Sequence, residues 1–135
     1  MANPEKRMGQ VYSYAIHLLS AFALIAGFAA VYLKVMPYAE LALIREGNIA
    51  ALLSIGGALL GFSLTLASSI AHNSTLLLVV AWAFGAMIVQ VLTYVVLSHL
   101  MPAMNRAIEE RNVAMGGLMG CTSLVVGIIN AACLT

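Results

Sequence analysis

The stretch that decides the fold lies near the middle of the chain, at residues 49–70, and reads IAALLSIGGALLGFSLTLASSI. It contains no Asp, Glu, Lys or Arg. An uncharged apolar run of about 18 or more residues is long enough to cross the roughly 30 Å of hydrocarbon in a bilayer as a helix. The stretch therefore predicts a transmembrane helix.

Three further runs share these properties, at residues 11–33, 76–97 and 113–134. Every charged residue falls outside the four runs: Glu5, Lys6, Arg7, Lys34, Glu40, Arg45, Glu46, Arg106, Glu109, Glu110 and Arg111. Because no carboxylate or lysine lies within a span, the pattern argues against a proton-coupled pump. We predict an all-α integral membrane protein with four transmembrane helices, preceded by a tail at residues 1–10.

The composition also indicates a protein that uses lipid as its solvent. Of 135 residues, 63% are hydrophobic and 8% charged, whereas soluble proteins carry roughly 25% charged residues. A net charge of +1 offers no basic surface for nucleic acid. The two cysteines, Cys121 and Cys133, lie about 18 Å apart along a single helix, which is too far for a disulfide bond. We therefore expect the bilayer as a partner, and neither nucleic acid, metal nor cofactor.

The loops indicate an internal repeat. IREGNIA at residues 44–50 aligns with IEERNVA at residues 108–114, and Met-Pro at residues 36–37 matches Met-Pro at residues 101–102. The chain thus divides into two-helix units at residues 11–70 and 76–134. Because each unit has an even number of spans, both enter the membrane from the same side, which predicts a parallel pseudo-two-fold repeat about the membrane normal.

Small residues follow one face of the second helix in each unit. They are Gly57 and Gly61 in the first unit, and Gly116, Gly120 and Gly127 in the second. Such spacing lets helix backbones approach closely in lipid, where no hydrophobic force drives helices together. We predict that these glycines form helix–helix contacts, either within one chain or between the subunits of a homo-oligomer.

An asparagine directly precedes two of the runs, Asn48 in the first unit and Asn112 in the second. The simpler interpretation is an N-cap, in which the side chain accepts a hydrogen bond from a first-turn N–H. The alternative is a cytoplasmic vestibule, in which two helix N-termini with partial positive charge hold an anionic group.

Polar residues within the spans include His17, Gln90, Thr93 and Asn130. Because His17 and Asn130 lie at similar depth, a contact between the first and fourth spans would satisfy both and form a polar core. The alternative is that the four residues line a wet pathway. His17 would then act as a pH-sensitive gate, since an unperturbed histidine has a pKa of about 6.5.

The distribution of positive charge predicts the orientation in the membrane. Lys6 and Arg7 lie on the side of the two termini, whereas the loops on the other side hold Lys34, Arg45, Arg106 and Arg111. Because cytoplasmic loops carry an excess of Lys and Arg, we place both charged loops in the cytoplasm and both termini outside. The loops are then available to a cytoplasmic protein.

Several motifs carry a resemblance to a known family. They are EGNIAA at residues 46–51, followed by Gly57 and by LLG at residues 59–61; MPA at residues 101–103; NVA at residues 112–114; GGLMG at residues 116–120; and the closing NAAC at residues 130–133. Together they resemble the YjfL-like family of bacterial inner-membrane proteins, a domain of unknown function with the number 350. The resemblance implies a bacterial cytoplasmic membrane and a duplicated two-helix domain, but no reaction or ligand. It also suggests transport or envelope-stress roles, and partners in polyamine metabolism or membrane-remodelling stress.

The sequence contains no phosphate-binding glycine loop, no zinc-protease histidine pair and no nucleophile beside a base, so we expect no enzyme. Two hypotheses remain. The first is a homo-oligomeric structural or envelope-stress module that joins through its glycine faces and recruits a cytoplasmic partner through its charged loops. The second is a small channel or transporter for ions or solutes such as polyamines, with its pathway at the repeat or subunit interface.

Overall fold

A computed structural model describes residues 3–134 as six helices. The long helices are α1 (Pro4–Val35), α3 (Ile49–His72), α4 (Leu76–Leu100) and α6 (Val113–Ala132), and the short ones are α2 (Glu40–Arg45) and α5 (Met104–Glu109). Residues 3–134 contain no strand, and all four long helices are long and apolar enough to cross a membrane. The prediction of an all-helical protein with four candidate membrane spans is therefore confirmed. The duplication and its pseudo-two-fold symmetry stay predictions.

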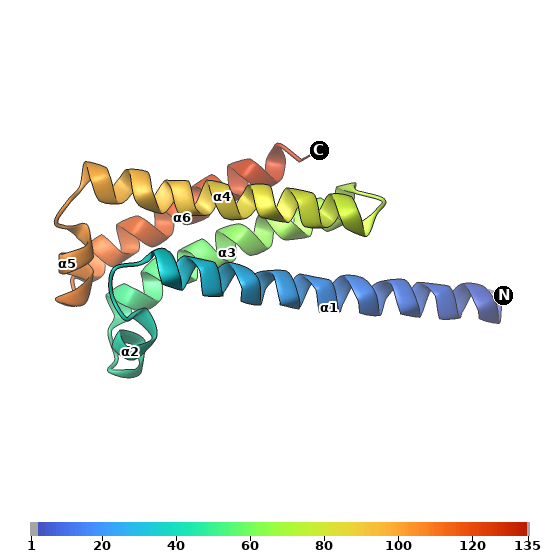
Figure 1. Ribbon diagram of the computed structural model, residues 1–135, viewed down its shortest axis with the longest axis horizontal. Coiled ribbons are helices and arrows are strands. Elements are labelled where there is room, and N and C mark those ends of the chain that lie inside the picture. Colours follow the sequence, from blue (N-terminus) through green and yellow to red (C-terminus); the bar gives the residue numbers. More distant parts are fainter. Residues whose placement is uncertain (1–2, 135) are drawn as a thin grey trace.

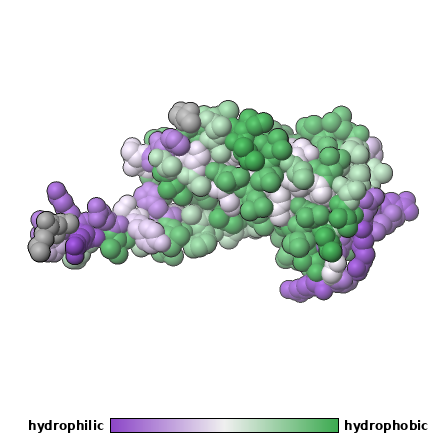
Figure 2. Space-filling model, turned by 180° about the vertical axis from the view of Figure 1, so that it is seen from behind, coloured by the Kyte–Doolittle hydropathy of each residue, from purple (hydrophilic) through white to green (hydrophobic). Residues whose placement is uncertain are grey.

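The long helices run side by side, with α2 and α5 at one end and the ends of the chain at the other (Figure 1). Figure 2 shows a hydrophobic surface over the middle of the molecule and hydrophilic side chains at both extremities. This distribution is typical of a helical bundle whose middle faces lipid and whose two ends face water.

The closest packing lies between α3 and α6. A Cβ atom added to Gly57 would collide with the backbone of Gly120, and one added to Gly127 would collide with the backbone of Gly61. Gly116 lies equally close to the backbone of Ala50. The structure thus places all five glycines in a contact within one chain, at a distance that leaves no room for a larger side chain.

Hydroxyl groups add hydrogen bonds along this contact. Thr65 on α3 donates from Oγ1 to the carbonyl oxygen of Gly127 at 3.0 Å, and Ser68 donates from Oγ to the carbonyl oxygen of Ala131 at 2.7 Å. Both acceptors lie on α6. Because lipid offers no competing partner, these bonds reinforce the pairing of the two helices.

Only the carboxyl half of α1 packs firmly against the rest of the chain. The ring of Phe28 stacks on that of Phe62 in α3 with centroids 4.4 Å apart, and the ring of Tyr32 meets that of Tyr94 in α4 at 5.8 Å. Phe28 and Tyr32 are the residues of α1 that are fully buried. Toward its amino-terminus, α1 extends beyond the turn that joins α3 to α4 (Figure 1).

Two features differ from the sequence expectations at the helix ends. α1 begins at Pro4, so most of the expected tail at residues 1–10 continues the helix; Asn3 caps it by accepting a hydrogen bond from the Glu5 N–H at 3.3 Å. Proline at the first helical position is typical of such a start. The helices α2 and α5 occupy the charged loops, where the sequence predicted no element.

Candidate functional site

Glu40, which the sequence placed among the loop charges, is buried. It is the first residue of α2, and only 1% of it is exposed. The sequence analysis found no carboxylate in the runs at residues 11–33, 49–70, 76–97 and 113–134 and did not identify this buried one beside them. It is buried because α2 packs back against α3 and brings its first residue into the core.

Several polar groups adjoin the Glu40 carboxylate. The hydroxyl of Tyr38 and the backbone N–H of Ile55 lie next to it, and the hydroxyl of Ser54 lies next to that of Tyr38. The carboxylate thus meets groups from α3 and from the segment between α1 and α2. All of these side chains are buried.

A second set of buried polar groups lies on the side of α1, α4 and α6. The hydroxyl of Tyr32 lies next to that of Ser123. Ser123 also accepts a hydrogen bond at its carbonyl oxygen from Nε2 of Gln90 at 3.0 Å. The Tyr94 hydroxyl donates to Oδ1 of Asn105 at 2.9 Å and so links α4 to the segment containing α5.

Seven buried side-chain oxygen atoms in this region form no hydrogen bond of standard geometry within residues 3–134, and we refer to them as the oxygen cluster. They are both carboxylate oxygens of Glu40, the hydroxyl oxygens of Tyr32, Tyr38, Ser54 and Ser123, and Oε1 of Gln90. Buried polar groups are nearly always hydrogen-bonded, because an unpaired group costs about 1–3 kcal/mol. Most of these oxygens lie beside another member of the cluster, because Tyr38 adjoins both Glu40 and Ser54, and Tyr32 adjoins Ser123. The Glu40 carboxylate is the charged member.

Burial changes the protonation of the Glu40 side chain. Removal from water raises the pKa of Glu40 to about 8, although the Ile55 N–H and the Tyr38 hydroxyl favour the ionised form. Burial and the adjacent Glu40 carboxylate also raise the pKa of the Tyr38 hydroxyl, which stays neutral. Within the described residues, no lysine, arginine or histidine forms an ion pair with Glu40.

The two asparagines lie at the first turns of α3 and α6. Oδ1 of Asn48 accepts a hydrogen bond from the Ala51 N–H at 3.1 Å, and Oδ1 of Asn112 accepts one from the Met115 N–H at 3.3 Å. Asn48 is buried, whereas Asn112 is exposed. Both side chains therefore have the geometry of N-caps.

Two hydrogen bonds join the charged loops to each other. Nδ2 of Asn48 donates to the carbonyl oxygen of Ile108 in α5 at 2.8 Å. Nη2 of Arg111, a residue with a φ of +66°, donates to the carbonyl oxygen of Glu46 at 3.1 Å. The helices α2 and α5, with the residues that connect them to α3 and α6, thus form one unit, which we call the loop cap.

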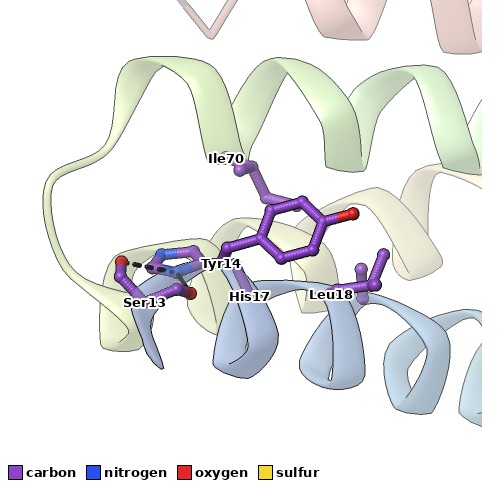
Figure 3. A pocket seen from close by; sticks show the side chains of 6 residues that line it. Ser13, Tyr14, His17, Leu18 and Ile70 are labelled. Atoms are coloured by element: carbon purple, nitrogen blue, oxygen red, sulfur yellow. Dashed lines mark hydrogen bonds between the residues drawn. The ribbon is translucent and has the colours of Figure 1, made fainter. Parts of the chain in front are cut away.

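His17 lies far from the loop cap, in a groove between α1 and α3 (Figure 3). The groove has a volume of about 420 Å³ and is lined in part by Ser13, Tyr14 and Ile70. Nδ1 of His17 lies 2.8 Å from the carbonyl oxygen of Ser13 on its own helix. Among the described residues, the expected contact with Asn130 is not formed, because the amino-terminal half of α1 stands apart from α6.

The remaining predicted polar residues lie in different surroundings. Gln90 is buried against α6, as described above, whereas Thr93 donates to the carbonyl oxygen of Val89 on its own helix and lines an apolar groove that it shares with Thr122. Asn130 is partly exposed near the carboxyl end of α6. These residues and His17 are therefore not gathered around a single cavity.

One signal in the sequence pointed to Glu40. Between Lys34 and Arg45 it is the sole charged residue in an otherwise apolar segment, residues 35–44. An isolated acid in such a segment is either exposed on a loop or drawn into the core. Position in the sequence does not decide between these outcomes, because the choice depends on whether α2 folds back onto α3.

Comparisons with known proteins agree over nearly the whole chain. A family described as "Domain of Unknown Function (DUF350)" matches residues 7–134. The "UPF0719 inner membrane protein YjfL" of Escherichia coli strain K12 is 31% identical over 128 residues, which cover 95% of this chain and 97% of that protein. The protein of the same name from Escherichia coli O157:H7 has the same identity and coverage. No solved structure is significantly similar. Since the family match spans nearly all of the residues, this chain belongs to the DUF350 family.

Proposed function

We propose that this chain is an inner-membrane structural or envelope-stress module that self-associates through the amino-terminal half of α1 and presents its loop cap to a cytoplasmic protein. The inner-membrane location rests on the name of the YjfL relatives. The observation that carries self-association is the unequal packing of α1. Its carboxyl half contains the buried Phe28 and Tyr32, whereas Tyr14 and Leu19 are 69% and 68% exposed.

The polar residues on α1 favour a protein neighbour over lipid alone. Ser13, His17 and Ser20 lie three or four positions apart and so share one face of the helix. A polar side chain in lipid lowers its free energy by finding a partner on another helix. Because α1 has few such partners within the chain, we assign them to α1 of a second copy of the protein.

The glycines of α3 and α6 are not available for self-association. From the sequence they were candidates for contacts either within the chain or between subunits. They lie against one another inside the chain, so self-association is assigned to α1 instead.

The loop cap supplies the surface for a cytoplasmic partner. It carries exposed charges of both signs, including Arg45, Glu46 and the ion pair of Arg106 with Glu110 at 3.0 Å. Mixed charges of this kind set the orientation and specificity of protein contacts. The excess of Lys and Arg at this end favours the cytoplasm.

Cysteine cross-linking in native membranes tests the α1 contact. Cys121 and Cys133 are free and exposed, so both are first replaced by serine. Ser13→Cys and Ser20→Cys, on the polar face of α1, are then compared with Leu19→Cys on another face of the same helix and with Ile88→Cys on α4. We expect an oxidant to convert Ser13→Cys and Ser20→Cys into covalent dimers far more efficiently than Leu19→Cys or Ile88→Cys. Equal yields at all four positions would contradict the proposal.

A second candidate is a small transporter for cations, and the oxygen cluster is the observation that favours it. Its carboxylate, Glu40, is buried beside the spans, and buried ionisable groups of membrane proteins commonly mark ion pathways. Ion flux from liposomes that contain the purified chain tests this candidate, with Glu40→Gln and Asn130→Leu as paired variants. Flux that Glu40→Gln abolishes and Asn130→Leu preserves would favour it, and the absence of flux for Na⁺, K⁺ and polyamines would eliminate it.

A further inference from the structure

The oxygen cluster has the chemistry of a cation site. Its atoms come from α1, the segment before α2, α2 itself, α3, α4 and α6. They comprise one carboxylate, four hydroxyl oxygens and one amide oxygen, all hard ligands. The carboxylate gives the cluster a single negative charge when it is ionised, and no basic residue neutralises it within residues 3–134.

We propose that the oxygen cluster binds a monovalent metal cation, Na⁺ or K⁺, with Glu40 as the charged ligand and the hydroxyls of Tyr38 and Ser54 as neutral ligands. One carboxylate balances one positive charge, so the occupied site is neutral within the low dielectric of the protein interior. A divalent or transition metal fits less well, since the described residues contain no group of three His, Cys, Asp or Glu side chains.

A depression in the surface adjoins two of the proposed ligands. It has a volume of about 170 Å³, lies beside the segment between α1 and α2, and is lined in part by Leu33, Tyr38 and Glu40.

Glu40 is the carboxylate of the cluster. Tyr38 from the preceding segment, Tyr32 from α1 and Tyr94 from α4 face it, and Glu109 on α5 acts on Tyr38. The charge on the site therefore comes from Glu40, and the tyrosine hydroxyls are neutral neighbours.

Radioactive cation binding to the full chain in lipid nanodiscs tests the proposal. The probes are ²²Na⁺ for sodium and ⁸⁶Rb⁺ as the analogue of potassium, at constant ionic strength with N-methylglucamine as the inert cation. We expect saturable binding of one of the two at pH 9. The probe that binds identifies the ion.

Three variants give the test its specificity. Glu40→Gln keeps the shape of the side chain but removes the charge, and we expect it to abolish binding. Tyr38→Phe removes one neutral ligand, and we expect the dissociation constant to rise about tenfold, equivalent to about 1.4 kcal/mol. Glu46→Gln, an exposed residue at the same end of the molecule, serves as the matched control and leaves the affinity unchanged.

The proposal is overturned if neither probe binds the wild-type chain at pH 9, or if Glu40→Gln binds as tightly as the wild type. If circular dichroism shows that Glu40→Gln does not fold, a folded Tyr38→Phe variant decides, and wild-type affinity in that variant rejects the site. The proposal concerns binding alone. Absence of the α1 cross-link, or absence of ion flux, therefore does not contradict the proposed binding site.

Discussion

The α3–α6 pair and helix α1 are both long and apolar, yet they pack in opposite ways. A Cβ atom added to Gly57 on α3 would collide with Gly120 on α6, whereas a Cβ atom added to Gly27 on α1 would meet nothing within 4 Å. The difference lies in orientation, because Gly57 faces the small residues of α6, whereas Gly27 lies on the exposed side of α1. Helix α1 attaches instead through aromatic rings near its carboxyl end.

The largest effect is expected for Gly57→Ala, which tests the close contact of α3 with α6. The adjacent Gly56→Ala is its control. The new methyl group at residue 57 would press on the Gly120 backbone, and we expect it to destabilise the fold by about 3 kcal/mol. At residue 56 the added Cβ meets nothing within 4 Å, and replacing glycine in a helix gains up to about 1 kcal/mol. Thermal unfolding of the purified chain in detergent, followed by circular dichroism, separates the two. Equal midpoints would show that the backbones are not in contact.

The attachment of α1 is tested by Phe28→Ala, compared with Phe22→Ala on the same helix. Phe28 is fully buried and stacks on Phe62, whereas Phe22 is 62% exposed. We expect a loss of about 2 kcal/mol at Phe28, less than in a water-soluble core because lipid also solvates the ring, and almost none at Phe22. The measurement is the same thermal unfolding. A larger loss at Phe22 would mean that the exposed half of α1 is packed after all.

The pH dependence of stability tests the burial of Glu40 at the junction of α1, α2 and α3. Because burial raises the pKa of Glu40 from 4.5 to about 8, the folded chain holds a proton that the unfolded chain has released between these pH values. Stability is therefore full below about pH 4.5 and falls as the pH rises toward 8. Without Na⁺ or K⁺, we expect the midpoint of thermal unfolding to drop by roughly 10 °C from pH 5 to pH 8.

The variant Glu40→Gln removes this pH dependence, whereas the exposed Glu46→Gln retains it. Both midpoints are measured in the same buffer series, with N-methylglucamine as the cation. An identical fall in wild type and Glu40→Gln would assign the effect to another group.

The smallest expected effect distinguishes the two asparagines. Asn48→Ala removes the cap of α3 and the 2.8 Å hydrogen bond to the Ile108 carbonyl, whereas Asn112→Ala removes only the cap of α6. Since a lost cap costs about 1 kcal/mol and a buried hydrogen bond about 1 kcal/mol more, Asn48→Ala should be the more damaging by about 1 kcal/mol. Chemical unfolding of the two variants in parallel measures the difference, and equal losses would show that the loop cap gains nothing from the second bond.

Much of the architecture could be predicted because lipid imposes simple rules. Runs without charge indicated the four apolar helices, and the spacing of Gly57, Gly61, Gly116, Gly120 and Gly127 indicated which faces carry close contacts. The spacing could not say which helix each glycine meets. A periodic pattern defines one face of one helix, but the partner of that face lies elsewhere in the chain or in another subunit.

The candidate site was much harder to predict. His17, Gln90, Thr93 and Asn130 were visible as polar residues inside apolar runs, yet three-dimensional packing separates them. The oxygen cluster was not predicted, because Glu40 and Tyr38 lie outside the apolar runs. Ser54 and Ser123 lie within the runs and resemble the other small residues there.

The sequence by itself determined that this is a membrane protein with four apolar helices, because each helical segment is long, apolar and largely free of charge, and is therefore more stable in lipid than in water. Only the tertiary structure decided that α3 pairs with α6, that α1 stands partly free, and that Glu40 is buried beside the hydroxyl of Tyr38. The physical reason is that lipid solvates all apolar faces almost equally. The choice among helix partners therefore depends on shape and hydrogen bonding between residues far apart in the chain.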